Sequence, residues 1–198
     1  MLLHGAPIRD FSIFQIHRIH NPHNDRDHAR IGVLERLARA IAFAVDQHSI
    51  ADASLRMYKQ TSEVKWANQA LSAALEAGRL GPNFPEVHFV LGSVYKSTGK
   101  TNEAIAELNT ALKLAPNSDE GYRRLGEALR SSDEKASIQA YKKAIEINPY
   151  YWYNYNELGT ACLRFGRIPE AIEAYKKVIE IAPNVPSGYT NLGAAYFQ

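Results

Sequence analysis

The chain has 198 residues, of which 45% are hydrophobic and 22% are charged, so it can fold around a buried core. Its formal net charge is +2, and basic and acidic residues are interleaved. This pattern indicates neither a nucleic-acid partner nor a membrane surface. The single cysteine, Cys162, excludes an internal disulfide and a cysteine-based metal site.

The start of the chain lacks the basic stretch and following apolar run of a secretory signal. The most apolar segment, residues 37–45, is short and is interrupted by Arg39, so it does not read as a membrane span. A cytoplasmic location follows by default.

Residues 1–27 are rich in histidine and show no helical period, so we expect an irregular segment there. His17, His20 and His23 could in principle offer imidazoles to a metal ion. No spacing in this segment fixes a tetrahedral geometry, which favours a solvated terminus over a metal site.

Residues 28–84 are predicted to be helical. Apolar residues recur on one side of residues 28–48, and alanines recur on one face of residues 63–77, with Pro82 behind them. We interpret residues 28–84 as capping helices or as a degenerate copy of the repeat that follows.

A repeat of about 34 residues organises the rest of the chain. Leu-Gly pairs begin at Leu91, Leu125, Leu158 and Leu192, and the intervals between them are 34, 33 and 34 residues. Each complete copy ends in a proline, and these are Pro116, Pro149 and Pro183. Since proline cannot continue a helical ladder, each copy is expected to end a helix there.

Each copy contains the pattern of two helices. Apolar or aromatic residues lie three positions on either side of the Leu-Gly pair, which places them on one stripe of a first helix. The second helix alternates small and large residues, so the two helices can approach closely. Gly99 and Gly166 lie between the two helices, where a positive φ can end the first one. The middle copy lacks one residue near positions 131–134, so its turn should be tighter or distorted.

The pattern Tyr-x2-Leu-Gly-x2-Tyr, then Ala-x3-Tyr, then Pro, resembles the tetratricopeptide repeat. The resemblance covers residues 85–198. It implies an all-α, right-handed superhelical solenoid of antiparallel helix pairs. Complete units are expected at residues 85–118, 119–151 and 152–185, with a truncated fourth at 186–198.

No constellation for catalysis is apparent. Gly99-Lys100-Thr101 resembles the end of a phosphate-binding loop, but Val94 stands where that loop needs glycine, and a helix precedes it instead of a strand. Cys162 lies at an apolar helix position, so we expect it to be buried and unreactive. We therefore expect a non-enzymatic protein without a cofactor.

The resemblance implies that the first helices line a concave wall that binds peptides or partner helices. Family geometry assigns eleven residues to this wall: Glu86, Phe89, Ser93, Lys96, Glu120, Arg123, Glu127, Arg130, Tyr153, Asn156 and Thr160. Such a wall suits a peptide of mixed charge with one or two apolar anchors. The charges from Glu120 to Arg130 could equally be ordinary pairs on the surface of one helix. A clamp for a terminal carboxylate is not expected, since only Asn191 meets its asparagine position.

The aromatic run at residues 150–155 admits two readings. Trp152 and Tyr155 are expected to fill contacts between repeats, and Tyr150, Tyr151 and Tyr153 are left for binding.

Two functions stand at this point. The chain is an interaction scaffold, or it is the regulatory or docking arm of a larger signalling enzyme, a kinase or glycosyltransferase. The sequence at residues 53–66 and 86–88 loosely resembles the C-terminal repeat region of bacterial eukaryotic-like serine/threonine kinases. The partner is a protein or peptide, and the aromatic residues of the truncated fourth unit could also drive self-association.

Overall fold

The computed structural model describes residue 43 and residues 46–198. The chain divides into a unit at Met1–Phe43 and a unit at Ala44–Gln198, and only the second is described below. The predictions for residues 1–27, and most of those for residues 28–48, lie outside the described residues.

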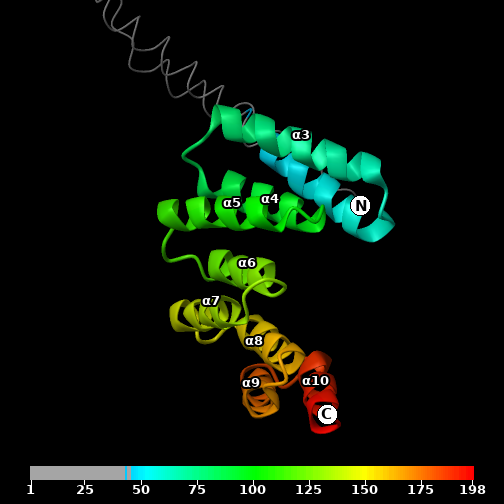
Figure 1. The fold of residues 1–198 in the computed structure, drawn as a ribbon, viewed down its shortest axis with the longest axis vertical. Helices are drawn as coiled ribbons and strands as arrows, with labels where there is room; N and C mark the ends of the chain where they lie inside the picture. Colours follow the sequence, from blue (N-terminus) through cyan, green and yellow to red (C-terminus); the bar gives the residue numbers. More distant parts are fainter. Residues whose placement is uncertain (1–42, 44–45) are drawn as a thin grey trace, which may run out of the picture. The chain divides into compact units, whose positions relative to one another are not determined.

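All regular structure in the described residues is helical. Residues 46–61 form a helix, and they are followed by α3 (Val64–Leu80), α4 (Pro85–Ser97), α5 (Thr101–Leu114), α6 (Asp119–Leu129), α7 (Glu134–Ile147), α8 (Trp152–Arg164), α9 (Ile168–Ile181) and α10 (Pro186–Tyr196). From α3 to α9 the successive layers of helices follow one another down the unit, and α10 lies beside α9 (Figure 1). The prediction of an all-α solenoid is confirmed. None of these helices is both long and apolar enough to cross a membrane.

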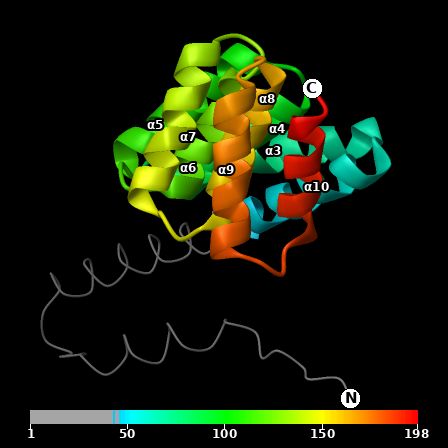
Figure 2. The ribbon, with the colours of Figure 1, turned by 90° about the horizontal axis from the view of Figure 1, so that it is seen from below.

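The helices pack in pairs, α4 with α5, α6 with α7 and α8 with α9, and α10 packs on α9 (Figure 2). The first helices of successive pairs also touch, α4 with α6, α6 with α8 and α8 with α10. The second helices α5, α7 and α9 make no comparable contact with one another. Helices in contact lie on the inside of a curve and separated helices lie on the outside, so the first helices line the inner side of this unit.

Burial follows the same order along the chain. One hydrophobic cluster joins the helix at 46–61 to α3 and α4, a second joins α4, α5 and α6, and a third joins α7, α8, α9 and α10. Each cluster is shared between neighbours because one helix pair cannot bury its apolar faces alone.

The Leu-Gly pairs allow the two helices of a pair to approach closely. A Cβ atom built on Gly92 would lie 2.6 Å from Leu108 of α5, and one on Gly159 would lie 2.6 Å from Tyr175 of α9. In the middle pair the Tyr141 ring lies 3.0 Å from the corresponding point on Gly126. There, the buried Ser137 hydroxyl also donates a 2.8 Å hydrogen bond to the Gly126 carbonyl.

The turns follow the sequence where glycine is present. Gly99 and Gly166 adopt φ values of 80° and 72°, as predicted. The turn between α6 and α7 has no residue of positive φ. There α6 ends early, at Leu129, and Asp133 caps α7 by accepting a 2.9 Å hydrogen bond from the Ala136 N–H. The conformation of this turn therefore differs from that of the other two turns, as expected, but the turn is not shorter than they are.

The prolines end the second helices as predicted. Helices α5, α7 and α9 stop at Leu114, Ile147 and Ile181, two residues before Pro116, Pro149 and Pro183 respectively.

We predict opposite effects for alanine at two glycines of the Leu-Gly pairs. Gly92→Ala should lower the free energy of unfolding by about 1–3 kcal/mol, because the new methyl group collides with Leu108. Gly193→Ala, where nothing lies within 4 Å, should raise it by about 0.5–1 kcal/mol through helix propensity. Urea unfolding followed by circular dichroism measures both. Equal destabilisation by the two variants would contradict close helix approach at Gly92.

Candidate functional site

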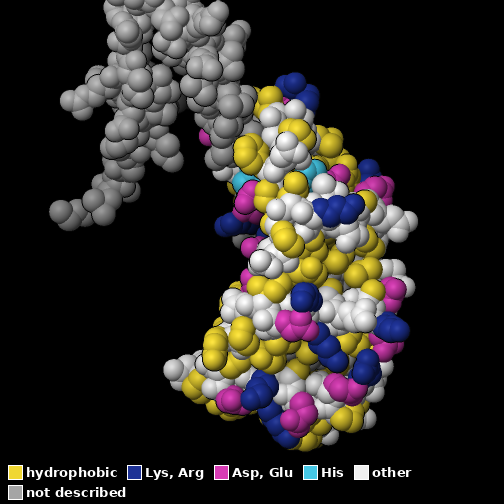
Figure 3. Space-filling model, turned by 90° about the vertical axis from the view of Figure 1, so that its left-hand side faces the viewer, with side chains coloured by type: hydrophobic (Ala, Val, Ile, Leu, Met, Phe, Trp, Pro, Cys, Tyr) yellow, Lys and Arg dark blue, Asp and Glu magenta, His cyan; other side chains and the backbone are white. Residues whose placement is uncertain are grey.

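Ten of the eleven predicted residues lie on α4, α6 and α8, the first helices that line the inner side, and Arg130 is the C-cap residue of α6 and is counted with it below. We call the surface formed by these three helices the inner face. Figure 3 shows one side of the molecule, on which basic and acidic side chains are interspersed among hydrophobic ones. This side of the molecule therefore does not favour a partner of a single charge sign, and the individual contacts decide what the inner face can bind.

Polar contacts join α4 to α6 across the inner face. The Lys96 ammonium donates to the Glu127 carboxylate. Arg124 donates to the Ser93 hydroxyl at 2.6 Å and to the Phe89 carbonyl at 3.2 Å, while it also holds Glu120 on its own helix. A shallow groove here is lined by Lys59, Lys96, Arg124 and Glu127, among others.

Burial and charge act in opposite directions on Glu127. Burial raises the pKa of its carboxyl group. The hydrogen bond from Lys96 and the charges of Lys96 and Arg130 lower the pKa, and together they outweigh the effect of burial. The net result is a lowered pKa, so Glu127 is ionised at neutral pH and the contact with Lys96 is an ion pair.

A second set of contacts joins α6 to α8. The Arg123 guanidinium lies over the Tyr153 ring, 5.0 Å from its centroid. The Tyr153 ring also meets Trp152 edge-on at 5.4 Å. Arg130 and Glu157 form an ion pair at 3.9 Å, longer than a hydrogen bond.

Some predicted wall residues hold the repeats together. The Phe89 ring occupies the space beside Gly121, where an added Cβ would lie 2.6 Å from it. Asn156 is buried and accepts a 2.8 Å hydrogen bond from Asn191 of α10. Thr160, in contrast, accepts a 3.3 Å hydrogen bond from the Tyr175 hydroxyl within its own helix pair. Phe89 therefore lies in packing between repeats and is not a free apolar anchor.

The structure brings Lys96 together with Glu127, and Arg123 together with Tyr153, whereas Glu86 is exposed and forms none of the contacts described above. The fixed family positions missed Arg124 and Glu157, each one residue after a predicted position. A charged residue beside a wall position is the signal that could have found them.

The aromatic run divides between exposure and packing. Tyr150 is 84% exposed and Tyr151 is 40% exposed. Trp152, Tyr153 and Tyr155 are partly buried.

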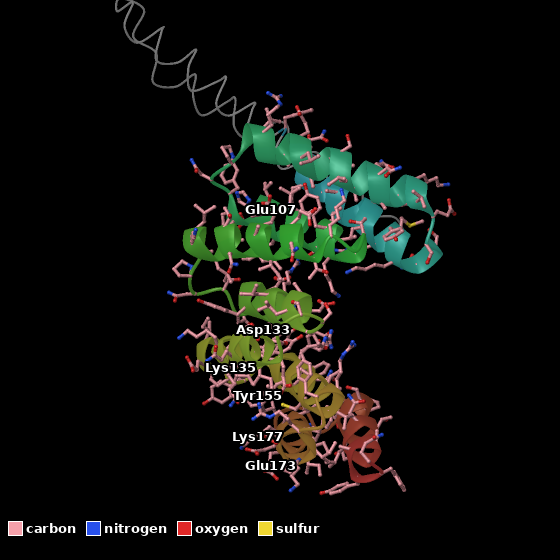
Figure 4. The ribbon with its side chains drawn as sticks, viewed as in Figure 1. Glu107, Asp133, Lys135, Tyr155, Glu173 and Lys177 are labelled. Atoms are coloured by element: carbon pink, nitrogen blue, oxygen red, sulfur yellow. The ribbon has the colours of Figure 1, made fainter. Side chains whose placement is uncertain are left out.

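The charges of the outer helices pair differently. Lys143 pairs with Glu146, and Lys177 with Glu180, each within one helix. Figure 4 shows Glu107, Lys135, Glu173 and Lys177 spread down the unit on α5, α7 and α9 instead of gathering at one place.

Among the described residues, no group of His, Cys, Asp or Glu could hold a metal ion. The histidines of residues 1–27 lie outside this range. Cys162 is buried, as predicted, and burial raises the pKa of its thiol.

Two equivalent tyrosines differ in the fate of their hydroxyl groups. Tyr175 packs on Gly159, and its hydroxyl meets Thr160, the residue after that glycine. Tyr141 packs on Gly126, and the equivalent residue is Glu127, whose carboxylate is engaged by Lys96. The Tyr141 hydroxyl is buried and has no hydrogen-bond partner among the described residues. Burial raises the pKa of this phenol well above its ordinary value.

Stacked helix pairs of this period, with their first helices in mutual contact, define a solenoid repeat protein. Family models for the tetratricopeptide repeat match residues 92–131 and 161–198, residues 140–173 and residues 124–151. A crystal structure of MamA is similar to this chain, with 34% sequence identity and a TM-score of 0.60. The match covers 67% of this chain and 78% of the MamA chain. The chain belongs to the tetratricopeptide repeat family.

Two curated relatives match shorter stretches. Small glutamine-rich tetratricopeptide repeat-containing protein 2 of Mycosarcoma maydis is 32% identical over 81 residues, which are 40% of this chain and 23% of that protein. The peroxisomal targeting signal receptor of Kluyveromyces lactis is 28% identical over 107 residues, 53% of this chain and 19% of the receptor. The chain thus matches about a fifth of the length of these relatives.

We predict that removing the two hydroxyl groups has unequal effects. Tyr175→Phe should lower the free energy of unfolding by about 0.5–1.5 kcal/mol, because a hydrogen bond is lost. Tyr141→Phe should leave it unchanged or raise it, because the lost hydroxyl is buried without a partner. Chemical denaturation of both variants tests this. A clear loss of stability in Tyr141→Phe would show that its hydroxyl is bonded.

We predict that the contribution of Glu127 to stability depends on pH. The lowered pKa means that ionised Glu127 stabilises the fold above its ordinary value of 4.5, and that this contribution is lost as pH falls through the lowered value. The difference in Tm between the wild type and Glu127→Gln should therefore be full at neutral pH and shrink below pH 4.5. In a Lys96→Gln background the same substitution should show a weaker dependence on pH. A difference that is constant with pH would exclude the ion pair.

Proposed function

We propose that the chain is a protein-interaction scaffold that holds an extended segment of another polypeptide against the inner face of α4, α6 and α8. The observation that carries this proposal is the row of charged side chains on α6, namely Arg123, Arg124, Glu127 and Arg130. All four reach neighbouring first helices instead of pairing only within α6.

This arrangement fixes polar groups in place before a partner arrives. Side chains that are already ordered lose little conformational entropy on binding, which favours affinity. Arg123, Arg130 and Tyr153 also belong to the residue types that most often carry binding energy at protein interfaces. The name of the peroxisomal relative describes a receptor for a targeting signal, which supports a peptide-holding role for repeats of this kind.

Within the proposed face, the residues divide into two groups. Lys96, Glu120, Arg123, Glu127, Arg130 and Tyr153 are proposed to meet the partner. Phe89 and Asn156 are proposed to set the spacing of the first helices, because their contacts run into neighbouring repeats. Thr160 is proposed to hold α9 against α8 within its own pair. Glu86 and Ser93 lie at the α4 end of the face.

Three expectations from the sequence stay predictions. They are that the array is an arm of a larger signalling enzyme, that it is related to the repeat region of bacterial kinases, and that it is cytoplasmic. The division into units at residues 85–118, 119–151 and 152–185 is likewise proposed. Self-association through residues 186–198 is supported by Tyr196 and Phe197, which are 61% and 93% exposed.

The proposed function predicts that binding is lost when the α6–α8 part of the face is altered. Peptides selected from a random display library against the full chain serve as probes. Tyr153→Ala combined with Arg123→Glu should weaken a wall-binding peptide by roughly tenfold or more, because an aromatic anchor and a cation are removed together. Fluorescence anisotropy gives the affinities, and circular dichroism confirms that the fold persists.

The matched control is Leu114→Ala combined with Lys177→Glu, which truncates one exposed apolar side chain and reverses one exposed charge on the outer helices α5 and α9. This variant should bind like the wild type. Equal binding by both double variants would exclude the inner face as the binding surface.

A further inference from the structure

Two buried hydrogen-bond donors beneath the α6–α8 part of the inner face lack an acceptor among the described residues. The first is the Tyr141 hydroxyl. Tyr141 is fully buried, and no described residue accepts its proton. Its equivalent, Tyr175, has a partner in Thr160. The difference arises because Glu127 stands at the position of Thr160 and its carboxylate is engaged by Lys96 of α4.

The second donor is the Arg123 Nε–H. This atom is buried and has no hydrogen-bond partner among the described residues. The nearest carboxylate, Glu120, lies 3.9 Å from the end of the Arg123 side chain and accepts hydrogen bonds from Arg124 instead. The Arg123 guanidinium is held over the Tyr153 ring, so it is fixed in place but its hydrogen-bonding capacity is not filled.

These donors lie in the same part of the face. Cζ of Tyr141, which carries the hydroxyl, lies 3.0 Å from the Cβ position of Gly126, and Arg123 and Arg130 stand about one helical turn before and after that glycine. The hydroxyl therefore lies near these two arginines, and both also act on it electrostatically. A buried donor without a hydrogen-bond partner lowers the stability of the fold. Two such donors in one place therefore favour binding of a hydrogen-bond acceptor there.

The local balance of charge defines the acceptor. Lys96 neutralises Glu127, and Arg124 neutralises Glu120. Across α4, α6 and α8, these contacts involve four cations, Lys96, Arg123, Arg124 and Arg130, but only three carboxylates, Glu120, Glu127 and Glu157, which leaves one positive charge uncompensated. A single carboxylate neutralises that charge. A carboxylate also matches the planar fork of a guanidinium and can accept a further hydrogen bond from a phenol.

We propose that the inner face binds a carboxylate of its partner polypeptide between α6 and α8, through hydrogen bonds from the Tyr141 hydroxyl and the Arg123 guanidinium. This inference rests on the proposed function and specifies the chemistry of the partner. Because Tyr141 is fully buried, binding requires neighbouring side chains to move aside. The Arg130–Glu157 contact at 3.9 Å is longer than a hydrogen bond, so this contact can open at little cost.

The experiment uses short blocked peptides as probes. Acetyl-Ser-Ala-Glu-Ala-Ser-amide carries one side-chain carboxylate, and the same peptide with Gln carries none. Each is titrated into the full isotope-labelled chain while the Arg123 Nε–Hε resonance is followed by NMR. The Glu peptide should shift this resonance and bind at least about threefold more tightly than the Gln peptide, as expected for a charge-assisted hydrogen bond.

Variants locate the carboxylate. Tyr141→Phe should remove most of the preference for Glu over Gln while it keeps the ring that packs on Gly126. Tyr175→Phe is the matched control, because its hydroxyl is already bonded to Thr160, and it should keep the preference. An undiminished preference in Tyr141→Phe would overturn the proposal. So would equal binding of the Glu and Gln peptides.

A further pair of peptides identifies the source of the carboxylate. The Gln peptide with a free C-terminus offers a terminal carboxylate, and a blocked phosphoserine peptide offers a phosphate. If the terminal carboxylate binds as the Glu side chain does, the site accepts either source. A phosphate that binds more tightly than both carboxylates would contradict the proposed chemistry.

Failure of this inference can be told apart from failure of the proposed function. If the display-selected peptides bind the inner face but show no dependence on Tyr141, only the carboxylate site is wrong. If those peptides are insensitive to Tyr153→Ala with Arg123→Glu, the inner face itself is not the binding surface.

Discussion

The close approach of two helices at a glycine is the contact on which the rest of the array depends. A large side chain of each second helix lies directly against a glycine of the first helix, and the absence of a Cβ atom sets the distance between them. The contacting residues are Leu108 with Gly92, Tyr141 with Gly126, and Tyr175 with Gly159. The first helices of successive pairs also touch, so the polar residues on their inner side come within reach of one another.

Charges on the two sides of the array are used differently. On the outer helices, lysine and glutamate pair three residues apart within one helix, as Lys177 does with Glu180. Such exposed pairs contribute little to stability but keep the surface polar. On the inner face, Lys96 and Arg130 reach carboxylates on the next first helix. Those contacts connect consecutive repeats, so the same side chains that are available to a partner also hold the array in register.

Most of the fold could be predicted because it depends on local signals. Gly99 takes a positive φ since a helix must end there, and Pro116 blocks further helix, so both effects are visible in the sequence. The site is harder to predict. Lys96 meets Glu127 only because the twist between repeats brings these positions together, and that twist depends on packing at many residues. The Phe89 ring faces Gly121 for the same reason, although its position in the repeat suggested a free surface.

Helix α6 is the common member of both sets of contacts across the inner face, and it is the shortest of the three helices that form this face. It has 11 residues against 13 in α4 and α8, and it contains two glycines. Short helices with glycine are marginal in isolation, so α6 owes its order to its neighbours. In a nearly one-dimensional array this makes it a joint between two halves. A ligand bound to α6 would therefore reduce motion at this joint. Binding at the centre of the array would make the two halves less mobile relative to each other.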